Sequence, residues 1–302
     1  MPVEGVLPVI PTPFRNGKFD HESFERFLDH MLEGVDGFTL LGSTGEAPSL
    51  TTAERQQIAA AVLELTPREK AVVVGITHTS LGEALELARH AEAHGAAALL
   101  CASPFYFANN ADGILAYLVR IDAAIGIELV LYDNPVATKT VLGADDVVRW
   151  SRELEHLQSV KLTDHDLRKV DAWHEAGLSV LAGDDPILFR YLAAGVDGAM
   201  VIAPCVFPDA FRETWTRVRN GDLAGAQAVF SAEIAPFLHV FGIGDEIATT
   251  KALLADIGVF ASAEVLPPLL PASDDRRTLL RNSYVLGRER TGARRAHEGA
   301  RV

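Results

Sequence analysis

Short apolar runs alternate with amphipathic segments along most of the chain. The runs that predict strands are residues 6–10, 37–41, 72–76, 97–101, 127–132, 157–162, 179–182 and 198–202. Each is followed by a segment with helical periodicity. Strands that alternate with helices pair in parallel, because each crossover returns the chain in the same direction. Eight such units most often close into a barrel, so we predict the α/β class and a (β/α)8 TIM barrel, with an open doubly wound sheet as the alternative.

Local capping signals support several of the predicted helices. Asp20 is a candidate N-cap for a helix over residues 20–33, and Thr51 with Glu54 forms a capping-box pattern. Further helices are predicted over residues 81–93, 222–240, 245–257 and from about residue 273. We therefore expect a catalytic barrel over residues 1–220 and a C-terminal helical extension over residues 221–302 packed on it. The Arg- and Gly-rich end of the chain is expected to be a solvated helix end or a frayed, disordered extension.

Composition narrows the possible partners. The 302 residues carry a formal net charge of −14, which argues against a nucleic-acid or anionic-membrane partner because such binding needs a basic surface. Two cysteines, Cys101 and Cys205, are too few for a disulfide framework and favour a reduced compartment. We see no secretory signal and no apolar stretch long enough to cross a bilayer. A cytoplasmic location is the expectation.

Polar residues at strand ends are the first candidates for chemistry, because a barrel carries its active site there. The second strand ends in a turn containing Ser43, Thr44 and Gly45, whose inward-pointing N–H groups would suit a carboxylate. The fifth strand ends at Tyr132. Taken alone, each signal also fits an ordinary turn after a strand.

Lys161 is the sharper signal, since it stands near the end of the apolar run of residues 157–162. Desolvating an ammonium is costly, so a buried lysine favours the neutral amine that attacks carbonyls and forms imines. A lone strand lysine is more often one that extends its amine to solvent at the rim. Its coincidence with Tyr132 and the Ser43–Thr44 turn favours the catalytic interpretation.

Other polar groups are weaker candidates for metal or phosphate sites. His90 and His94 have helical i, i+4 spacing but lack a third ligand, and the segment 164–166 fits the N-cap and first turn of the next helix better than a metal site. His78 ends the third strand and could line the pocket. Acidic residues follow Gly183, so a phosphorylated substrate is not expected. We predict no metal and no organic cofactor.

Several motifs together resemble the dihydrodipicolinate synthase/N-acetylneuraminate lyase family. They are the turn of residues 42–46, the segment 132–135, Lys161 and the segment 183–185, and the likeness runs from residues 5–14 to Lys251 and the prolines at 267 and 268. The resemblance implies that Lys161 forms a Schiff base with pyruvate or a related 2-oxo acid. It implies that Tyr132 moves protons and that Ser43 and Thr44 bind the carboxylate.

The resemblance also implies an oligomer. Tyr106 matches a second tyrosine that, in the family's homotetramers, reaches into a neighbouring subunit's site, where it completes a proton relay with Ser43 and Tyr132. We therefore expect a homo-oligomer, either a tetramer or a dimer. The remaining residues expected to contact substrate lie at or beyond strand ends: Gly45, Thr163, Gly183, Asp185 and Met200.

Four positions depart from the family pattern. Ala137 stands where the synthases carry an arginine that grips the second substrate's carboxylate, which argues against the lysine-biosynthetic reaction. Pro186 stands where the sialic-acid lyases carry a glutamate, which argues against a polyhydroxylated sugar-acid tail. Asp133 replaces the motif asparagine, and Cys205 ends a segment that lacks the usual serine and asparagine. All four are expected in or near the pocket for the second substrate.

The predicted function is an aldolase-type lyase that acts on a 2-oxo acid through a Schiff base on Lys161. One alternative is a 2-oxo-sugar-acid dehydratase that uses the same imine. Another is a catalytically retired barrel that binds 2-oxo acids. A metal-dependent aldolase is disfavoured because no convincing ligand cluster is visible. The expected partner is a small-molecule substrate, without nucleic acid or membrane.

Overall fold

The computed structural model describes residues 2–240 and 245–299, with side chains to residue 290. Close contacts divide the chain into two compact units. The first joins the residues up to Ile10 with Asp36–Val201, and the second joins Pro11–Val35 with the chain from Ile202 onward. Each unit is described by itself. None of the described helices combines the length and apolar character needed to cross a membrane.

The first unit contains an eight-stranded parallel sheet that closes into a barrel. Its strands, in spatial order, are β1 (Gly5–Val6), β10 (Gly198–Ala199), β9 (Ser179–Ala182), β8 (Leu157–Leu162), β7 (Glu128–Asp133), β6 (Ala98–Ala102), β5 (Ala71–Gly75) and β4 (Gly37–Leu40). A parallel bridge between Val9 and Thr39 joins the two ends of this order, and the Ile10 N–H donates to the Thr39 carbonyl at 2.9 Å. The predicted (β/α)8 barrel is confirmed.

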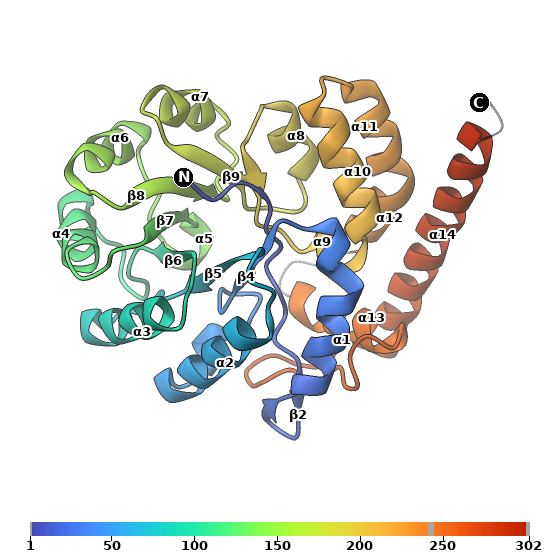
Figure 1. Cartoon of the computed structure of the whole chain (residues 1–302), viewed down its shortest axis with the longest axis horizontal. Helices are drawn as coiled ribbons and strands as arrows, with labels where there is room; N and C mark the ends of the chain where they lie inside the picture. Colours follow the sequence, from blue (N-terminus) through green and yellow to red (C-terminus); the bar gives the residue numbers. More distant parts are fainter. Residues whose placement is uncertain (1, 241–244, 300–302) are drawn as a thin grey trace. The chain divides into compact units, whose positions relative to one another are not determined.

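Helices surround these strands in the first unit (Figure 1). They are α2 (Thr52–Leu65), α3 (Leu81–Ala93), α4 (Ala111–Asp122), α5 (Pro135–Thr138), α6 (Ala144–Glu153), α7 (Arg168–Glu175) and α8 (Leu188–Ala193), with the 3-10 turn η2 (Ala47–Ser49) before α2. The predicted capping box is present, since Thr51 accepts from the Glu54 N–H and Glu54 accepts from the Thr51 N–H. The fully buried strand residues explain why the runs are apolar throughout rather than alternating.

The second unit is mainly helical. It contains the hairpin β2 (Phe14–Arg15) and β3 (Lys18–Phe19), then α1 (His21–Met31), η1 (Leu32–Gly34), α9 (Ala203–Val206), α10 (Pro208–Arg219), α11 (Leu223–Val229), η3 (Phe230–Ile234), α12 (Ala235–Leu238), α13 (Glu246–Asp256) and α14 (Asp274–Gly299). Asp20 caps α1 as predicted, because its side chain accepts from the Ser23 N–H.

Two predicted spans were wrong in detail. Residues 222–240 do not form one helix, because a π-turn interrupts the ladder and Pro236 follows at the start of α12. The last strand is only two residues long, although the N–H of Met200 still bonds the Ala182 carbonyl at 2.8 Å. The Arg-rich end is helical to Gly299, which agrees with the helix-end alternative; residues 300–302 of the predicted tail lie outside the described residues.

Candidate active site

Two neighbouring strands bring the predicted amine and its predicted partner together. The register of the parallel pair places Tyr132 of β7 directly beside Lys161 of β8. Lys161 is 4% exposed and Tyr132 is 8% exposed. The Lys161 Nζ atom lies 4.1 Å from the centroid of the Tyr132 ring. The ring therefore covers the amine and reduces its access to water.

Lys161 differs from the other buried lysines in its bonding. Lys169 forms ion pairs with Asp133 at 2.7 Å and Asp164 at 2.5 Å, and the Lys251 amine donates to the Glu264 carbonyl at 2.7 Å. Among the residues that the structure describes, the Lys161 amine makes no hydrogen bond or ion pair. A buried amine without an anionic partner is unusual, which marks Lys161 as a candidate for a chemical role.

A cavity of about 260 Å³ opens at the strand ends beside Tyr132. Its walls are contributed by the ends of β4 to β7 and the segments that follow them. The residues that line it are Leu41, Gly42, Ser43, Ala47, Pro48, Leu50, Arg55, Thr77, His78, Leu100, Ala102, Phe105, Tyr132, Asn134, Ala137 and Thr138. The structure thus brings Ser43 and Tyr132 to one cavity, and the prediction that His78 lines a pocket is confirmed.

The other predicted substrate residues do not line this cavity. They are Thr44, Gly45, Thr163, Gly183, Asp185 and Met200. Thr44 and Gly45 belong to the same turn as Ser43. Met200 is fully buried, and the Asp185 carbonyl accepts from the Leu188 N–H at 3.1 Å. Their substrate contacts stay predictions.

Close packing beside Lys161 explains why position 183 is a glycine. A Cβ atom at Gly183 would lie 2.6 Å from the Thr163 hydroxyl oxygen, 2.8 Å from the Leu162 carbonyl oxygen and 3.0 Å from Cγ of Lys161. Contacts below about 3.4 Å are repulsive for carbon. The absence of a side chain at Gly183 leaves room for Lys161 in its observed position.

The turn that carries Ser43 is held in an unusual backbone conformation. Leu41 and Glu46, which flank it, have φ values of 55° and 58°, in the left-handed region that costs a non-glycine residue about 1 kcal/mol. The Glu46 N–H donates to the Ser43 carbonyl at 3.0 Å and closes the turn. Such conformations persist where the surroundings hold them and cluster at functional sites.

Tyr106 lies outside this cavity. It is 73% exposed, has a φ of 84°, and packs edge to face with the exposed Phe107 at 4.8 Å between ring centroids. Together with Phe105 it lines a second hollow. Within the described part of this chain no hydrogen bond joins Tyr106 to Tyr132 or Ser43. A single chain therefore does not contain the three-residue relay implied by the family resemblance.

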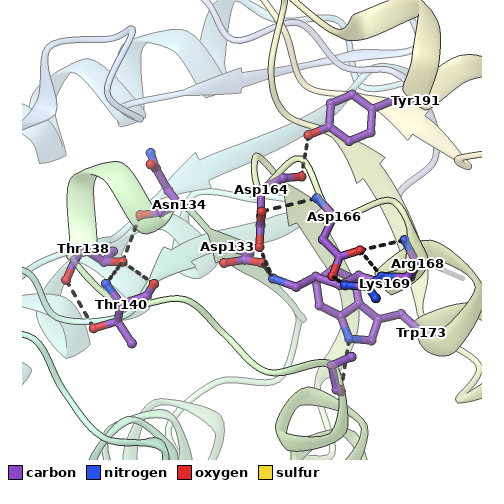
Figure 2. A network of polar contacts seen from close by, with 11 residues as sticks. Asp133, Asn134, Thr138, Thr140, Asp164, Asp166, Arg168, Lys169, Trp173 and Tyr191 are labelled. Carbon is purple, nitrogen blue, oxygen red and sulfur yellow. Dashed lines mark hydrogen bonds and ion pairs between the residues drawn. The ribbon is translucent and has the colours of Figure 1, made fainter.

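A buried ion-pair network ties β7 to the segment that follows β8 (Figure 2). The Lys169 amine bridges Asp133, which is 0% exposed, and Asp164, whose carbonyl accepts from the Tyr191 hydroxyl at 2.8 Å. Burial raises the pKa of the Asp133 carboxyl above its usual value, although Lys169 opposes this. The pKa of Lys169 is also raised: burial lowers it, but its hydrogen bonds to the two carboxylates outweigh burial.

The Asp133 carboxylate is enclosed with Lys169, and its expected place in or near the second-substrate pocket stays a prediction. The network corrects one prediction. The segment 164–166 is not the first turn of the next helix, which begins at Arg168 without a side-chain cap. Asp164 instead pairs with Lys169, and Asp166 pairs with Arg168 at 2.8 Å.

A protein-family model agrees with this fold and site. The model of the dihydrodipicolinate synthetase family matches residues 2–284, nearly the whole chain. The chain belongs to this family.

Relatives and solved structures agree with that membership. The 4-hydroxy-tetrahydrodipicolinate synthase of Thermosipho melanesiensis is 28% identical over 279 residues, which cover 91% of this chain and 96% of the relative. The crystal structure of dihydrodipicolinate synthase from Thermotoga maritima has a TM-score of 0.87 at 28% identity, covering 93% of this chain and 97% of that one. This member of the dihydrodipicolinate synthetase family is an aldolase-type lyase.

A further structure shows the fold alone. The 4-hydroxy-tetrahydrodipicolinate synthase from Methylacidiphilum fumariolicum SolV has a TM-score of 0.91 at 24% identity, and the match covers 97% of this chain and 98% of that one. The similarity of the fold thus covers nearly the whole chain.

Arg55 lines the cavity, although the sequence analysis did not single it out. It is 3% exposed, and its guanidinium donates to the carbonyls of Gly75 at 2.8 Å and Thr77 at 3.1 Å. Burial lowers the pKa of Arg55 to about 10. The signal was available, because Arg55 shares the helical stripe of the buried residues Ile58 and Val62.

Asn134 was also missed, although it lines the cavity. Its side-chain amide donates to the Tyr132 hydroxyl at 3.0 Å. No sequence signal predicted this contact. Residues two apart on one strand point to the same face, but β7 ends at Asp133, so this rule does not apply to Asn134.

Within residues 2–240 and 245–299, no group of three His, Cys, Asp or Glu side chains could hold a metal ion.

Proposed function

We propose that this chain is a Schiff-base lyase of 2-oxo acids, with Lys161 as the amine that forms the imine. The observation that carries the proposal is the position of the Lys161 amine, 4.1 Å from the Tyr132 ring and without an ionic partner among the described residues. Tyr132 also lines the adjoining cavity, whose lining residues do not include Lys161, so a substrate there has room beside the tyrosine. The sequence motifs at Ser43–Gly45 support the same assignment.

The first half of the proposed reaction builds the imine. The substrate carboxylate binds at the Ser43–Thr44–Gly45 turn, and the neutral Lys161 amine attacks the ketone carbon to form a carbinolamine. Tyr132 donates its proton to the carbinolamine hydroxyl, which leaves as water. The products of this half are a protonated imine on Lys161 and a transient Tyr132 phenolate.

The second half breaks the carbon–carbon bond. The phenolate takes the proton of the substrate's C4 hydroxyl while the C3–C4 bond breaks, its electron pair moves toward the iminium nitrogen, and an aldehyde leaves. The resulting enamine takes a proton at C3, and water then hydrolyses the imine to release pyruvate. The imine serves as the electron sink, so Lys161 itself supplies the chemistry that the reaction needs.

The cavity favours a second substrate without a carboxylate. The one cationic residue among those that line it is Arg55, and two of its guanidinium nitrogens already donate to backbone carbonyls. Ala137, at the position of the synthase arginine, lines the cavity and adds no charge. This supports our proposal that the chain does not catalyse the lysine-biosynthetic reaction.

The polar groups of the cavity are also largely committed to the protein. Thr77 accepts from the Ala102 N–H at 2.9 Å, His78 accepts from the Ser80 N–H at 2.9 Å, and Thr138 donates to the Asn134 carbonyl at 2.9 Å. Leucine, alanine, proline and phenylalanine side chains form much of the remaining wall. A polyhydroxylated substrate would find few free partners, so we propose an aldehyde with an apolar remainder.

We further propose that Tyr106 acts between subunits of a homo-oligomer. The exposed aromatic pair of Tyr106 and Phe107 supports this, because exposed aromatic clusters mark interaction surfaces. Sedimentation of the wild type and Tyr106→Ala tests it. A shift of the variant toward smaller species with reduced activity supports the proposal, and an unchanged assembly with full activity overturns it.

Trapping of the imine tests the main proposal. The protein is incubated with pyruvate, reduced with borohydride, and analysed by intact and peptide mass. We expect one adduct on the Lys161 peptide, its absence from Lys161→Ala, and its retention in Lys139→Asn. This control removes an exposed lysine. Asparagine is chosen because it tolerates the left-handed backbone at position 139, where φ is 58°.

Two outcomes would redirect the assignment. Absence of an adduct with pyruvate and with longer 2-oxo acids would make Lys161 a structural lysine and favour a 2-oxo-acid-binding protein. With an adduct present, product analysis separates the two enzymes: a lyase releases pyruvate and an aldehyde, while a dehydratase yields a single product of full carbon length.

A further inference from the structure

Asn134 is held in one orientation by the helix that it caps. Its side-chain oxygen accepts from the Ala137 N–H at 3.2 Å, at the N-cap of α5. A backbone N–H can only donate, so the group that faces it must be the amide oxygen. The opposite end of the amide, the NH2 group, therefore faces the Tyr132 hydroxyl at 3.0 Å. The Thr138 hydroxyl, which donates to the Asn134 carbonyl at 2.9 Å, holds the same turn (Figure 2).

This orientation determines the direction of the Tyr132 proton. Because Asn134 is the donor in their contact, the Tyr132 oxygen is the acceptor, and its own proton must point elsewhere. Within the described part of the chain, the Tyr132 hydroxyl donates to no other residue. Since Tyr132 lines the cavity, its proton is free for a molecule bound there.

We propose that Asn134 is a positioning residue for proton transfer by Tyr132. Its amide holds the phenol so that the proton faces the substrate, and it stabilises the phenolate left after that proton is donated. A hydrogen bond to a charged oxygen is stronger than one to a neutral oxygen, so the contact tightens at the step where charge develops. Asn134 acts through Tyr132 and is not itself assigned a bond to the substrate.

This inference rests on the proposed function, because it concerns the same tyrosine. It adds a requirement that the imine proposal lacks: residue 134 must be a donor toward Tyr132, not merely a polar group of similar size. The asparagine side chain satisfies two demands at once, with its oxygen on the helix and its NH2 on the phenol.

Asn134→Asp separates these two demands. Aspartate caps helices about as well as asparagine, so the contact with the Ala137 N–H is kept. The new carboxylate cannot donate, and the Tyr132 proton turns toward it and away from the cavity. Asn110→Asp is the matched control, because Asn110 caps α4 by accepting from the Gly113 N–H at 2.8 Å and does not line the cavity.

Two readouts are needed. The first follows deuterium exchange at the pyruvate methyl group by proton NMR across pH, which requires only the imine and proton transfer. The second follows the phenolic carbon resonance of Tyr132 in tyrosine-labelled protein without substrate. We expect Asn134→Asp to exchange about 10-fold to 100-fold more slowly, with a displaced pH–rate profile and a shifted Tyr132 resonance. Asn110→Asp should match the wild type in both readouts, and all three proteins should unfold at similar temperatures.

The outcomes are distinguishable. If Asn134→Asp exchanges at the wild-type rate, or if its Tyr132 resonance is unchanged, the inference is overturned even when borohydride still labels Lys161. If the wild type gives no label on Lys161, the proposed function fails. The Tyr132 resonance then still shows whether Asn134 donates to the phenol, and an unchanged resonance overturns the inference.

Discussion

The Lys161 amine lies 4.1 Å from the centre of the Tyr132 ring, and strand register makes the two residues direct neighbours across β8 and β7. The Tyr132 ring therefore covers the amine, while the Tyr132 hydroxyl accepts from the Asn134 amide at 3.0 Å.

Tyr132→Phe keeps the ring and removes the hydroxyl. We expect turnover to fall about 100-fold to 10,000-fold, because positioned proton transfer contributes factors of this size. Thermal stability should stay close to that of the wild type, and Lys161 should still be labelled slowly by pyruvate and borohydride. Tyr132→Ala removes the ring as well and should also lower the unfolding temperature. Full turnover in Tyr132→Phe would remove the hydroxyl from the mechanism.

Gly183→Ala should displace Lys161. The added Cβ would lie 2.6 Å from the Thr163 hydroxyl oxygen and 3.0 Å from Cγ of Lys161. We expect a destabilisation of about 1–3 kcal/mol and at least a 10-fold loss in the rate of imine trapping. Gly82→Ala is the control, because its nearest neighbour is 3.8 Å away and alanine favours the α3 helix. Equal trapping rates in the two variants would contradict this account.

Lys169→Met should leave Asp133 buried without its cation. Removing one partner of a buried ion pair costs about 3–5 kcal/mol. Burial already raises the pKa of Asp133, and loss of Lys169 raises it further, so the carboxyl must take up a proton on folding. Because that uptake is harder at high pH, the loss of stability should be larger at pH 8 than at pH 5. Denaturant titrations at both pH values measure it.

Arg168, next to Lys169 in the chain, provides the control for Lys169→Met. Arg168 is 90% exposed and pairs with Asp166. Arg168→Met should change stability by less than about 1 kcal/mol, because exposed ion pairs contribute little. A loss in Lys169→Met that is equally large at both pH values would show that lost packing, and not the charge of Asp133, causes it.

Asp256→Asn should weaken the second unit, and this loss too should be larger at high pH than at low pH. Burial alone would raise the pKa of Asp256, but its contacts with Arg277 and Arg281 outweigh burial and lower it. A lowered carboxyl pKa stabilises the fold above about pH 4, and the benefit is lost as the pH falls. We expect a loss of about 1–3 kcal/mol at pH 7 that shrinks below pH 4, with the exposed Asp275→Asn near wild type. Chemical denaturation at pH 7 and pH 3 measures the difference.

Aldehyde preference should follow the charge and polarity of the cavity wall. With pyruvate as donor, benzaldehyde or hexanal should be used at least about 10-fold more efficiently than glyceraldehyde or succinic semialdehyde. Ala137→Arg places a cation in the cavity and should raise the efficiency for the carboxylated aldehyde. Val136→Arg is the control, because Val136 is 89% exposed and does not line the cavity. Equal use of all four aldehydes by the wild type would contradict an apolar pocket.

Local patterns in the sequence predict the elements of the fold. The predicted spans of α3, β8 and β9 agree with the structure at both ends, and the caps at Asp20 and Thr51 are present. These features depend on side-chain period and on hydrogen bonds between residues three apart, which a local pattern contains. The proximity of Tyr132 and Lys161 could also be predicted, because both stand at the ends of neighbouring parallel strands, and these ends lie at one edge of the barrel.

Contacts between distant polar groups depend on the packing of the whole barrel. Asp133 and Lys169 are 36 residues apart, and Arg55 reaches carbonyls 20 and 22 residues away. Such partners depend on strand register and on the path of each crossover, which hydrophobic period does not specify. Asn134 is two residues from Tyr132, yet its role depends on the helix that fixes its amide. The sequence determined which chemical groups are present, and the packing of the barrel determined the direction in which each of them points.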